Sequence, residues 1–141
     1  MSSLPTPASN VTFPRTHEAY LSLTEQARNQ VAVARAVIAP LGGKAATPTP
    51  VQLQFALADG HEAIGKLMRA SATLGDEIPA QWSVRASGSV TQAVSEIQRM
   101  LDGRTADTTF AVGCLDQAVH DIDRGRRLLI SPPSTNVYDG S

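Results

Sequence analysis

The chain has 141 residues and a formal net charge of -1 at pH 7, with 42% hydrophobic and 18% charged residues. This length favours one domain with a core of its own, and the near-zero charge argues against a general attraction to nucleic acid or anionic membranes. The single cysteine, Cys114, excludes an intrachain disulfide. No apolar run approaches the roughly 20 residues that span a bilayer, so we expect a protein that is cytoplasmic at synthesis and has no membrane partner.

Both ends of the chain are rich in Ser, Thr and Pro and are too polar to build a core. We therefore divide the chain into an extended arm (1–15), a helical domain (16–131) and a C-terminal tail (132–141). Polar, proline-bearing ends usually become ordered against other surfaces. This favours contacts between the two ends and neighbouring subunits.

The first predicted helix runs from Thr16 to about Ala39. Apolar residues recur there at steps of three and four, which is the period of one helical face. Thr16 is a suitable N-cap, and Pro40 prevents continuation. The predicted core face consists of Tyr20, Leu23, Ala27, Val31, Ala34 and Ile38.

The second predicted helix starts at Thr49–Pro50, a capping residue followed by proline, and stops at Gly75. Gly60 and Gly65 inside it each cost roughly 1 kcal/mol relative to Ala. They indicate either close approach of another helix or a kink beside a site. The predicted core face consists of Leu53, Leu57, Gly60, Ile64, Leu67, Met68, Ser71 and Leu74.

Residues 76–88 are interpreted as a connection that carries the only tryptophan, Trp82. Ser89 and Gln92 match a capping box, so the third helix is predicted from there to Asp102–Gly103. The fourth helix is predicted to begin near Thr105 or Asp107 and to end at Ser131–Pro132, because proline prevents continuation.

Strand signals are absent from the chain, since no alternating apolar run is bounded by turns. The predicted fold is all-α, a four-helix bundle with an extended N-terminal arm and a C-terminal tail. A third connection of about three residues makes the third and fourth helices antiparallel neighbours. The first two connections, about nine and thirteen residues long, permit either an up-down order or a crossover.

His61 and the segment HEAIGK resemble the phosphoacceptor segment of histidine phosphotransfer domains, which are four-helix bundles of similar size. The resemblance implies that His61 accepts a phosphoryl group while Gly65, one turn away, leaves room. The family pattern has lysine three residues after the histidine, where this chain has Ile64; Lys66 follows the glycine instead. The alternative is a solvated surface histidine beside a Glu62–Lys66 pair.

His120 has Asp116 one turn before it, a spacing that holds a divalent cation when another helix supplies further ligands. Di-iron bundles use Glu-x-x-His, which does not occur in this chain. The alternative is a charged outer face with Asp121–Arg124 and Asp123–Arg127 pairs. We therefore expect no metal and no other cofactor.

Three arginines, Arg124, Arg126 and Arg127, lie near the end of the fourth predicted helix, where their positive charge interacts favourably with the helix dipole. The alternative is that they contact phosphate groups or RNA. Cys114 lies at the edge of the apolar stripe and is predicted to be a buried structural thiol. No G-x-S-x-G turn or phosphate-binding loop occurs. We therefore expect no enzymatic activity, and nucleic acid is not the expected partner.

These observations favour a protein that functions by binding partners through its surface. The first hypothesis is a self-assembling structural subunit of a larger phage-like or bacterial particle, a virion component that binds copies of itself or other proteins of the assembly. The second is a regulatory adaptor or secreted effector-like binding module, because the Ser/Pro-rich start resembles leaders of bacterial contact-dependent secretion. The third is a phosphotransfer-type carrier that uses His61.

Overall fold

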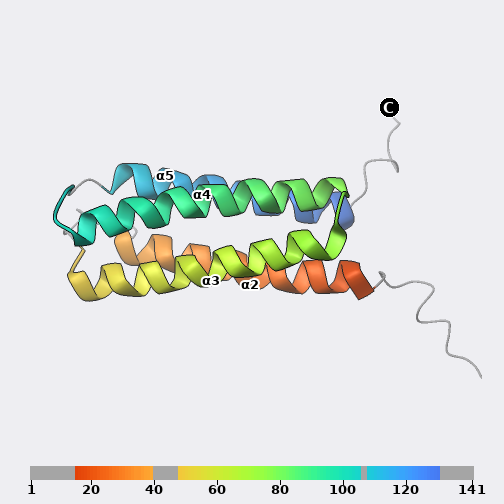
Figure 1. Cartoon of the computed structure of the whole chain (residues 1–141), viewed down its shortest axis with the longest axis horizontal. Helices are drawn as coiled ribbons and strands as arrows, with labels where there is room; N and C mark the ends of the chain where they lie inside the picture. The colour runs from red at the N-terminus through yellow and green to blue at the C-terminus, as the bar shows by residue number, and fades with distance from the viewer. Residues whose placement is uncertain (1–14, 40–47, 106–107, 131–141) are drawn as a thin grey trace, which may run out of the picture.

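A computed structural model describes residues 15–39, 48–105 and 108–130. Within those ranges the chain forms four helices and no strand, which confirms the predicted all-α four-helix bundle (Figure 1). The predicted arm and tail lie outside the described residues, except for Arg15, which begins the first helix. The helices are α2 (Arg15–Ile38), α3 (Pro50–Leu74), α4 (Ile78–Leu101) and α5 (Thr109–Ile130).

Consecutive helices run antiparallel, so the order is up-down-up-down and no crossover is needed (Figure 1). Helix α2 packs on α3 and α5, and α4 packs on the same two helices. The bundle therefore has two layers, α2 with α3 and α4 with α5. The start of α2, the α3–α4 connection and the end of α5 lie at the same end of the bundle.

The buried residues of α2 and α3 fall at alternating steps of three and four, and those of α4 and α5 repeat every seven positions with up to three buried positions in each heptad. This heptad pattern is typical of bundles whose side chains interlock as in coiled coils. Alanine fills one of the core positions in most heptads, which lets the helix axes approach closely. The buried alanines are Ala27 and Ala34 on α2, Ala56, Ala63 and Ala70 on α3, Ala80, Ala86 and Ala93 on α4, and Ala111 and Ala118 on α5.

Helix α3 begins and ends where the sequence predicts. Thr49 and Gln52 form a capping box. The backbone N–H of Gln52 donates to Thr49 Oγ1 at 3.2 Å, and the backbone N–H of Thr49 donates to Gln52 Oε1 at 2.9 Å. Pro50 occupies the first turn, where no backbone donor is required. Gly75 ends the helix with a φ of 65°, in the region that favours glycine.

The predicted connection over 76–88 is wrong, because α4 begins at Ile78 and runs without a break through Ser89. Pro79 lies in the first turn of α4, where proline is compatible with a helix. Gly88 does not stop the helix, because core residues lie before and after it, among them Ala86 and Val90. Core packing therefore outweighs the roughly 1 kcal/mol cost of one glycine.

The core face of α3 is also rotated from the predicted one. Leu57 and Ile64 are half-buried and Met68 is exposed, whereas Ala56 and Ala63 are fully buried. The small residues face inward because α3 approaches its neighbours closely there. On α2, Thr24 is buried and the predicted core residue Leu23 is only half-buried. Helix α5 begins at Thr109, so Thr105 precedes it, and Asp107 lies outside the described residues.

Candidate functional site

His61 lies exposed on α3, and no described residue forms a hydrogen bond or ion pair with it. Gly65, one turn later, is also exposed, and no described atom lies within 4 Å of a Cβ added there. Lys66 lies five residues after His61, which is about 140° around the helix, so the two side chains do not share a face. The predicted Glu62–Lys66 pair is replaced by a hydrogen bond from Gln30 Nε2 to Glu62 Oε1 (2.5 Å).

Two carboxylates of α5, Asp116 and Asp123, bind arginines of α2. Arg28 Nε and Nη2 donate to the two oxygens of Asp123 at 2.7 and 3.2 Å, and Arg35 Nε donates to Asp116 at 2.7 Å. The two pairs are one heptad apart on both helices, so they form a ladder along the α2/α5 seam. The predicted Asp123–Arg127 pair is wrong for this reason. In the described ranges, no three His, Cys, Asp or Glu side chains form a metal-binding group.

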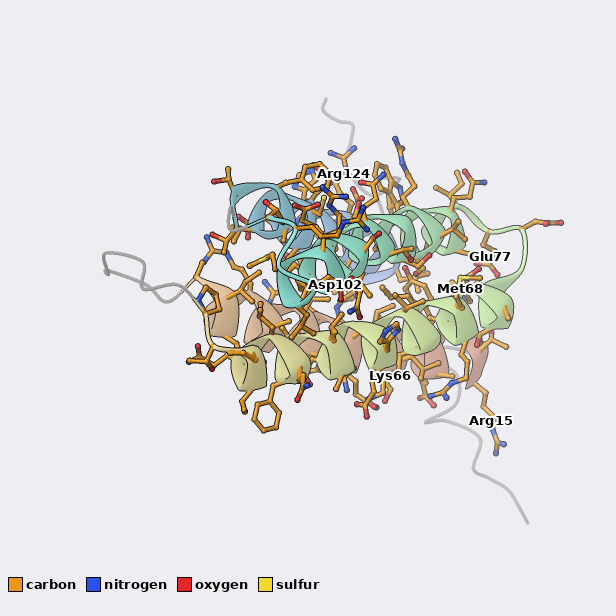
Figure 2. All side chains as sticks on the ribbon, turned by 60° about the vertical axis from the view of Figure 1, so that its left-hand side comes forward. Arg15, Lys66, Met68, Glu77, Asp102 and Arg124 are labelled. Carbon is orange, nitrogen blue, oxygen red and sulfur yellow. The ribbon has the colours of Figure 1, made fainter. Side chains whose placement is uncertain are left out.

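The arginines near the end of α5 point in different directions. The Arg124 guanidinium lies 4.9 Å from the centre of the Trp82 ring, in the α4/α5 layer and away from Lys66 on α3 (Figure 2). Arg126 donates to the backbone carbonyl of Leu21 (2.5 Å) and to Thr24 Oγ1 (3.0 Å). Arg127 is exposed. The three side chains therefore do not converge on one phosphate position, and Arg124 does not form the predicted pair with Asp121.

A buried polar network joins α2, α4 and α5 at the end of the bundle where α2 starts. The Tyr20 hydroxyl donates to the carbonyl of Pro79 (2.8 Å) and accepts from Ser83 Oγ (3.1 Å). Burial raises the pKa of Tyr20, although the Ser83 hydrogen bond and the charge of Arg126 oppose the shift. Gly125 leaves the space that the Tyr20 hydroxyl occupies. The sequence offers no signal for this network, because its members lie on three helices.

The surface between α4 and α5 is hollowed into two adjoining depressions, which we call the α4/α5 groove. The two depressions share Ser89, Gln92 and Gln117 as lining residues. Phe110 flanks one depression and Arg85 the other. The remaining lining residues are Gly88, Thr109, Gly113, Cys114 and Asp121.

The thiol of Cys114 and the carboxylate of Asp121 line this groove. The buried Cys114 thiol donates to Gln92 Oε1 at 3.7 Å, and burial together with the charge of Glu96 raises the pKa of Cys114. The thiol is therefore kept in its protonated, weakly nucleophilic form. Asp121 is only 4% exposed and accepts one hydrogen bond, from Gln117 Nε2 to Oδ1 at 3.0 Å.

Small residues explain why the groove is hollow. Gly88 near the middle of α4 and Gly113 in the second turn of α5 are exposed, and beyond the local helix backbone no described atom lies within 4 Å of a Cβ added at either. Ser89 and Cys114 fill the next positions of the seam. These two glycines, which lie outside the core face, were the signal in the sequence that could have predicted the groove. It was missed because residues 76–88, which include Gly88, were predicted to be a connection between helices.

Comparison with known proteins identifies no relative: neither a family model, nor a curated protein, nor a solved structure matches this chain. None of the described helices is both long and apolar enough to cross a membrane. The class that the fold defines is an antiparallel four-helix bundle with a surface groove between its last two helices.

Proposed function

We propose that this protein is a non-enzymatic structural subunit that associates with copies of itself, as part of a larger phage-like or bacterial particle. The observation that supports the proposal is the position of its phenylalanines. The chain has three, and Phe13 lies outside the described residues. The other two, Phe55 and Phe110, are 62% and 55% exposed on the outer surface of the bundle.

An exposed phenylalanine forgoes a large stabilisation, because burying its side chain contributes about 1.5–3 kcal/mol. The core of this bundle is filled mainly by Ala, Val, Leu and Ile, together with Met100, Cys114 and one aromatic residue, Tyr20. Aromatic side chains are enriched at protein interfaces. The placement of both phenylalanines outside the core therefore supports a role in contacts with other chains.

The mass of the full chain in solution tests this proposal. Sedimentation equilibrium over a wide concentration range should give a multiple of 14.9 kDa. Phe55→Ser and Phe110→Ser should weaken association without unfolding the bundle, whereas Ala58→Ser, also exposed on α3, should leave it unchanged. A monomer at every concentration would contradict self-assembly and favour the adaptor or effector-like alternative.

A phosphotransfer-type carrier is the other candidate, and the exposure of His61 beside the open Gly65 position favours it. Incubation with phosphoramidate should then give an acid-labile phosphate that His61→Ala abolishes. His120→Ala, which changes an exposed histidine on α5, is the matched control. Equal labelling of wild type and His61→Ala would exclude this candidate.

A further inference from the structure

We propose that the N-terminal arm folds back on its own bundle and packs Val11 and Phe13 into an apolar groove at the end where α2 starts. We call this depression the end groove. Its lining residues are Glu77, Ile78, Pro79, Leu128 and Leu129. The contact lies within one chain, so the inference goes beyond the proposed self-association and does not depend on it.

The end groove leaves apolar surface open to water. Ile78, the first residue of α4, is 60% exposed. Leu128 and Leu129 at the end of α5 are half-buried, so part of each side chain also faces outward. Covering such a surface is favourable because it removes apolar area from water. A segment from outside the described residues that covers the end groove would therefore stabilise the folded chain.

Contacts of α2 place its start beside the end groove. His17, in the first turn of α2, pairs with Glu77, with 3.3 Å between Nε2 and Oε1. Tyr20, one turn later, donates to the carbonyl of Pro79 at 2.8 Å. Both partners line the end groove. Arg15 and Glu77 accordingly lie at the same end of the bundle (Figure 2). The chain that precedes Arg15 therefore starts within reach of the groove.

The length of chain between α2 and the apolar residues of the arm favours the chain's own arm as the occupant. Phe13 stands two residues before Arg15, and two extended residues span at most about 7 Å. A short tether gives an effective concentration in the millimolar range. That value exceeds the concentration of free chains in dilute solution, so the arm of a second copy would be outcompeted.

The sequence of the arm suits an extended segment with one apolar side. Pro14 disfavours the helical conformation at Phe13 and favours extended backbone there. Alternate side chains of an extended chain point to the same side. Val11 and Phe13 would then face the groove together, while Thr12 faces away.

The C-terminal tail is the alternative occupant, because it follows α5 directly. Its composition is less suitable. Pro132 and Pro133 favour a stiff polyproline conformation. Val137 and Tyr138 are consecutive, so their side chains would point to opposite sides of an extended chain.

Nuclear magnetic resonance of the unaltered full chain provides the direct test. With labelled methyl groups, we expect nuclear Overhauser contacts from the Phe13 ring to methyl groups of Ile78, Leu128 or Leu129. A mixture of labelled and unlabelled chains separates the chain's own arm from the arm of a second copy. Contacts that occur only between two chains would overturn the proposal. So would contacts from Tyr138 in place of Phe13, or none from either segment.

The reactivity of a thiol placed in the end groove provides the second test. Ile78→Cys in a Cys114→Ser background introduces a single thiol at a position exposed enough to accept the change. A covered thiol reacts only when the arm opens, so adding Phe13→Ser should raise its rate with a small disulfide reagent about tenfold or more. Thr12→Ser, on the other side of the arm, is the matched control and should leave the rate unchanged.

Each outcome of the thiol test decides the proposal. Equal rates with Phe13→Ser and Thr12→Ser would show that the arm does not cover the groove. A rate that rises with Tyr138→Ser and not with Phe13→Ser would assign the groove to the C-terminal tail. Protection that grows with protein concentration would assign it to a second copy. If the Ile78→Cys variant loses its cooperative melt, the resonance experiment on the unaltered chain decides.

Discussion

Gly60 on α3 lies directly against Val94 on α4: a Cβ built at Gly60 would be 2.5 Å from Cγ2 of the valine. No real contact is that short, so the glycine is required by the close packing of the two helices. Of the two explanations that the sequence left open for Gly60, close approach of another helix is the correct one. Gly65, which is only five residues later, faces open space.

The two glycines should therefore respond to alanine with opposite signs. Gly60→Ala should lower the free energy of unfolding by about 1–3 kcal/mol, because the valine or a helix must move. Gly65→Ala should raise it by up to about 1 kcal/mol through helix propensity. Urea unfolding measures both. A stabilising Gly60→Ala would show that α3 and α4 are farther apart than described.

Tyr20→Phe should destabilise the bundle by about 1–3 kcal/mol. The change removes a hydroxyl that donates to the Pro79 carbonyl and accepts from Ser83, and it leaves both buried partners without that bond. Urea unfolding of the variant and of Ser83→Ala measures the network. If Tyr20→Phe were neutral, the hydroxyl would contribute nothing to stability.

Alkaline pH should weaken the folded state through the same tyrosine. Burial raises the pKa of Tyr20 above its ordinary value of 10.0, so the folded chain holds this proton more tightly than the unfolded chain. The stability that this proton contributes is fully present below pH 10, the ordinary pKa of tyrosine in the unfolded chain. It is lost as the pH rises from there through the raised pKa of the folded chain. The free energy of unfolding of wild type should fall more steeply there than that of Tyr20→Phe. Parallel curves would contradict a raised pKa.

The Cys114 thiol should react slowly in the native protein. Burial, assisted by the charge of Glu96, raises the pKa of Cys114, so the thiolate forms only at higher pH than in the unfolded chain. The rate of alkylation by iodoacetamide should show a native pH profile displaced to higher pH relative to the profile in urea. Glu96→Gln should shift the native profile part of the way back. A native profile at lower pH would indicate an activated thiol.

An introduced aspartate should destabilise the bundle more at a buried position than at a half-buried one. Leu115 is 1% exposed, so Leu115→Asp buries an unpaired charge and should cost at least about 4 kcal/mol, which abolishes folding. Leu57 is half-buried, and Leu57→Asp should cost roughly 1–2 kcal/mol and retain a cooperative melt. Circular dichroism during heating distinguishes the two. Unfolding of both variants would place Leu57 in the core, as the sequence pattern predicted.

Local signals in the sequence predicted the helical class and several helix ends. The Thr49–Pro50 start and the glycines at 75 and 103 act within a few residues, so they can be recognised without knowledge of the packing. The predicted capping box of Ser89 and Gln92 is wrong, because both residues lie inside α4. Apolar residues at steps of three and four predicted the core face of α2 in outline, because any bundle buries such a stripe. The histidine candidate His61 was found by motif, but its surroundings were not.

The sequence by itself thus determined that four amphipathic helices form and where α3 begins and ends. Only the tertiary structure decided that α4 continues through Gly88, that alanines of α3 face inward, and that Arg28 bonds to Asp123. The physical reason is distance along the chain. Each of these features depends on a partner helix whose register against its neighbour is fixed by packing, and no local pattern encodes that register. The α4/α5 groove has the same origin, since its walls come from two helices that meet only in the folded bundle.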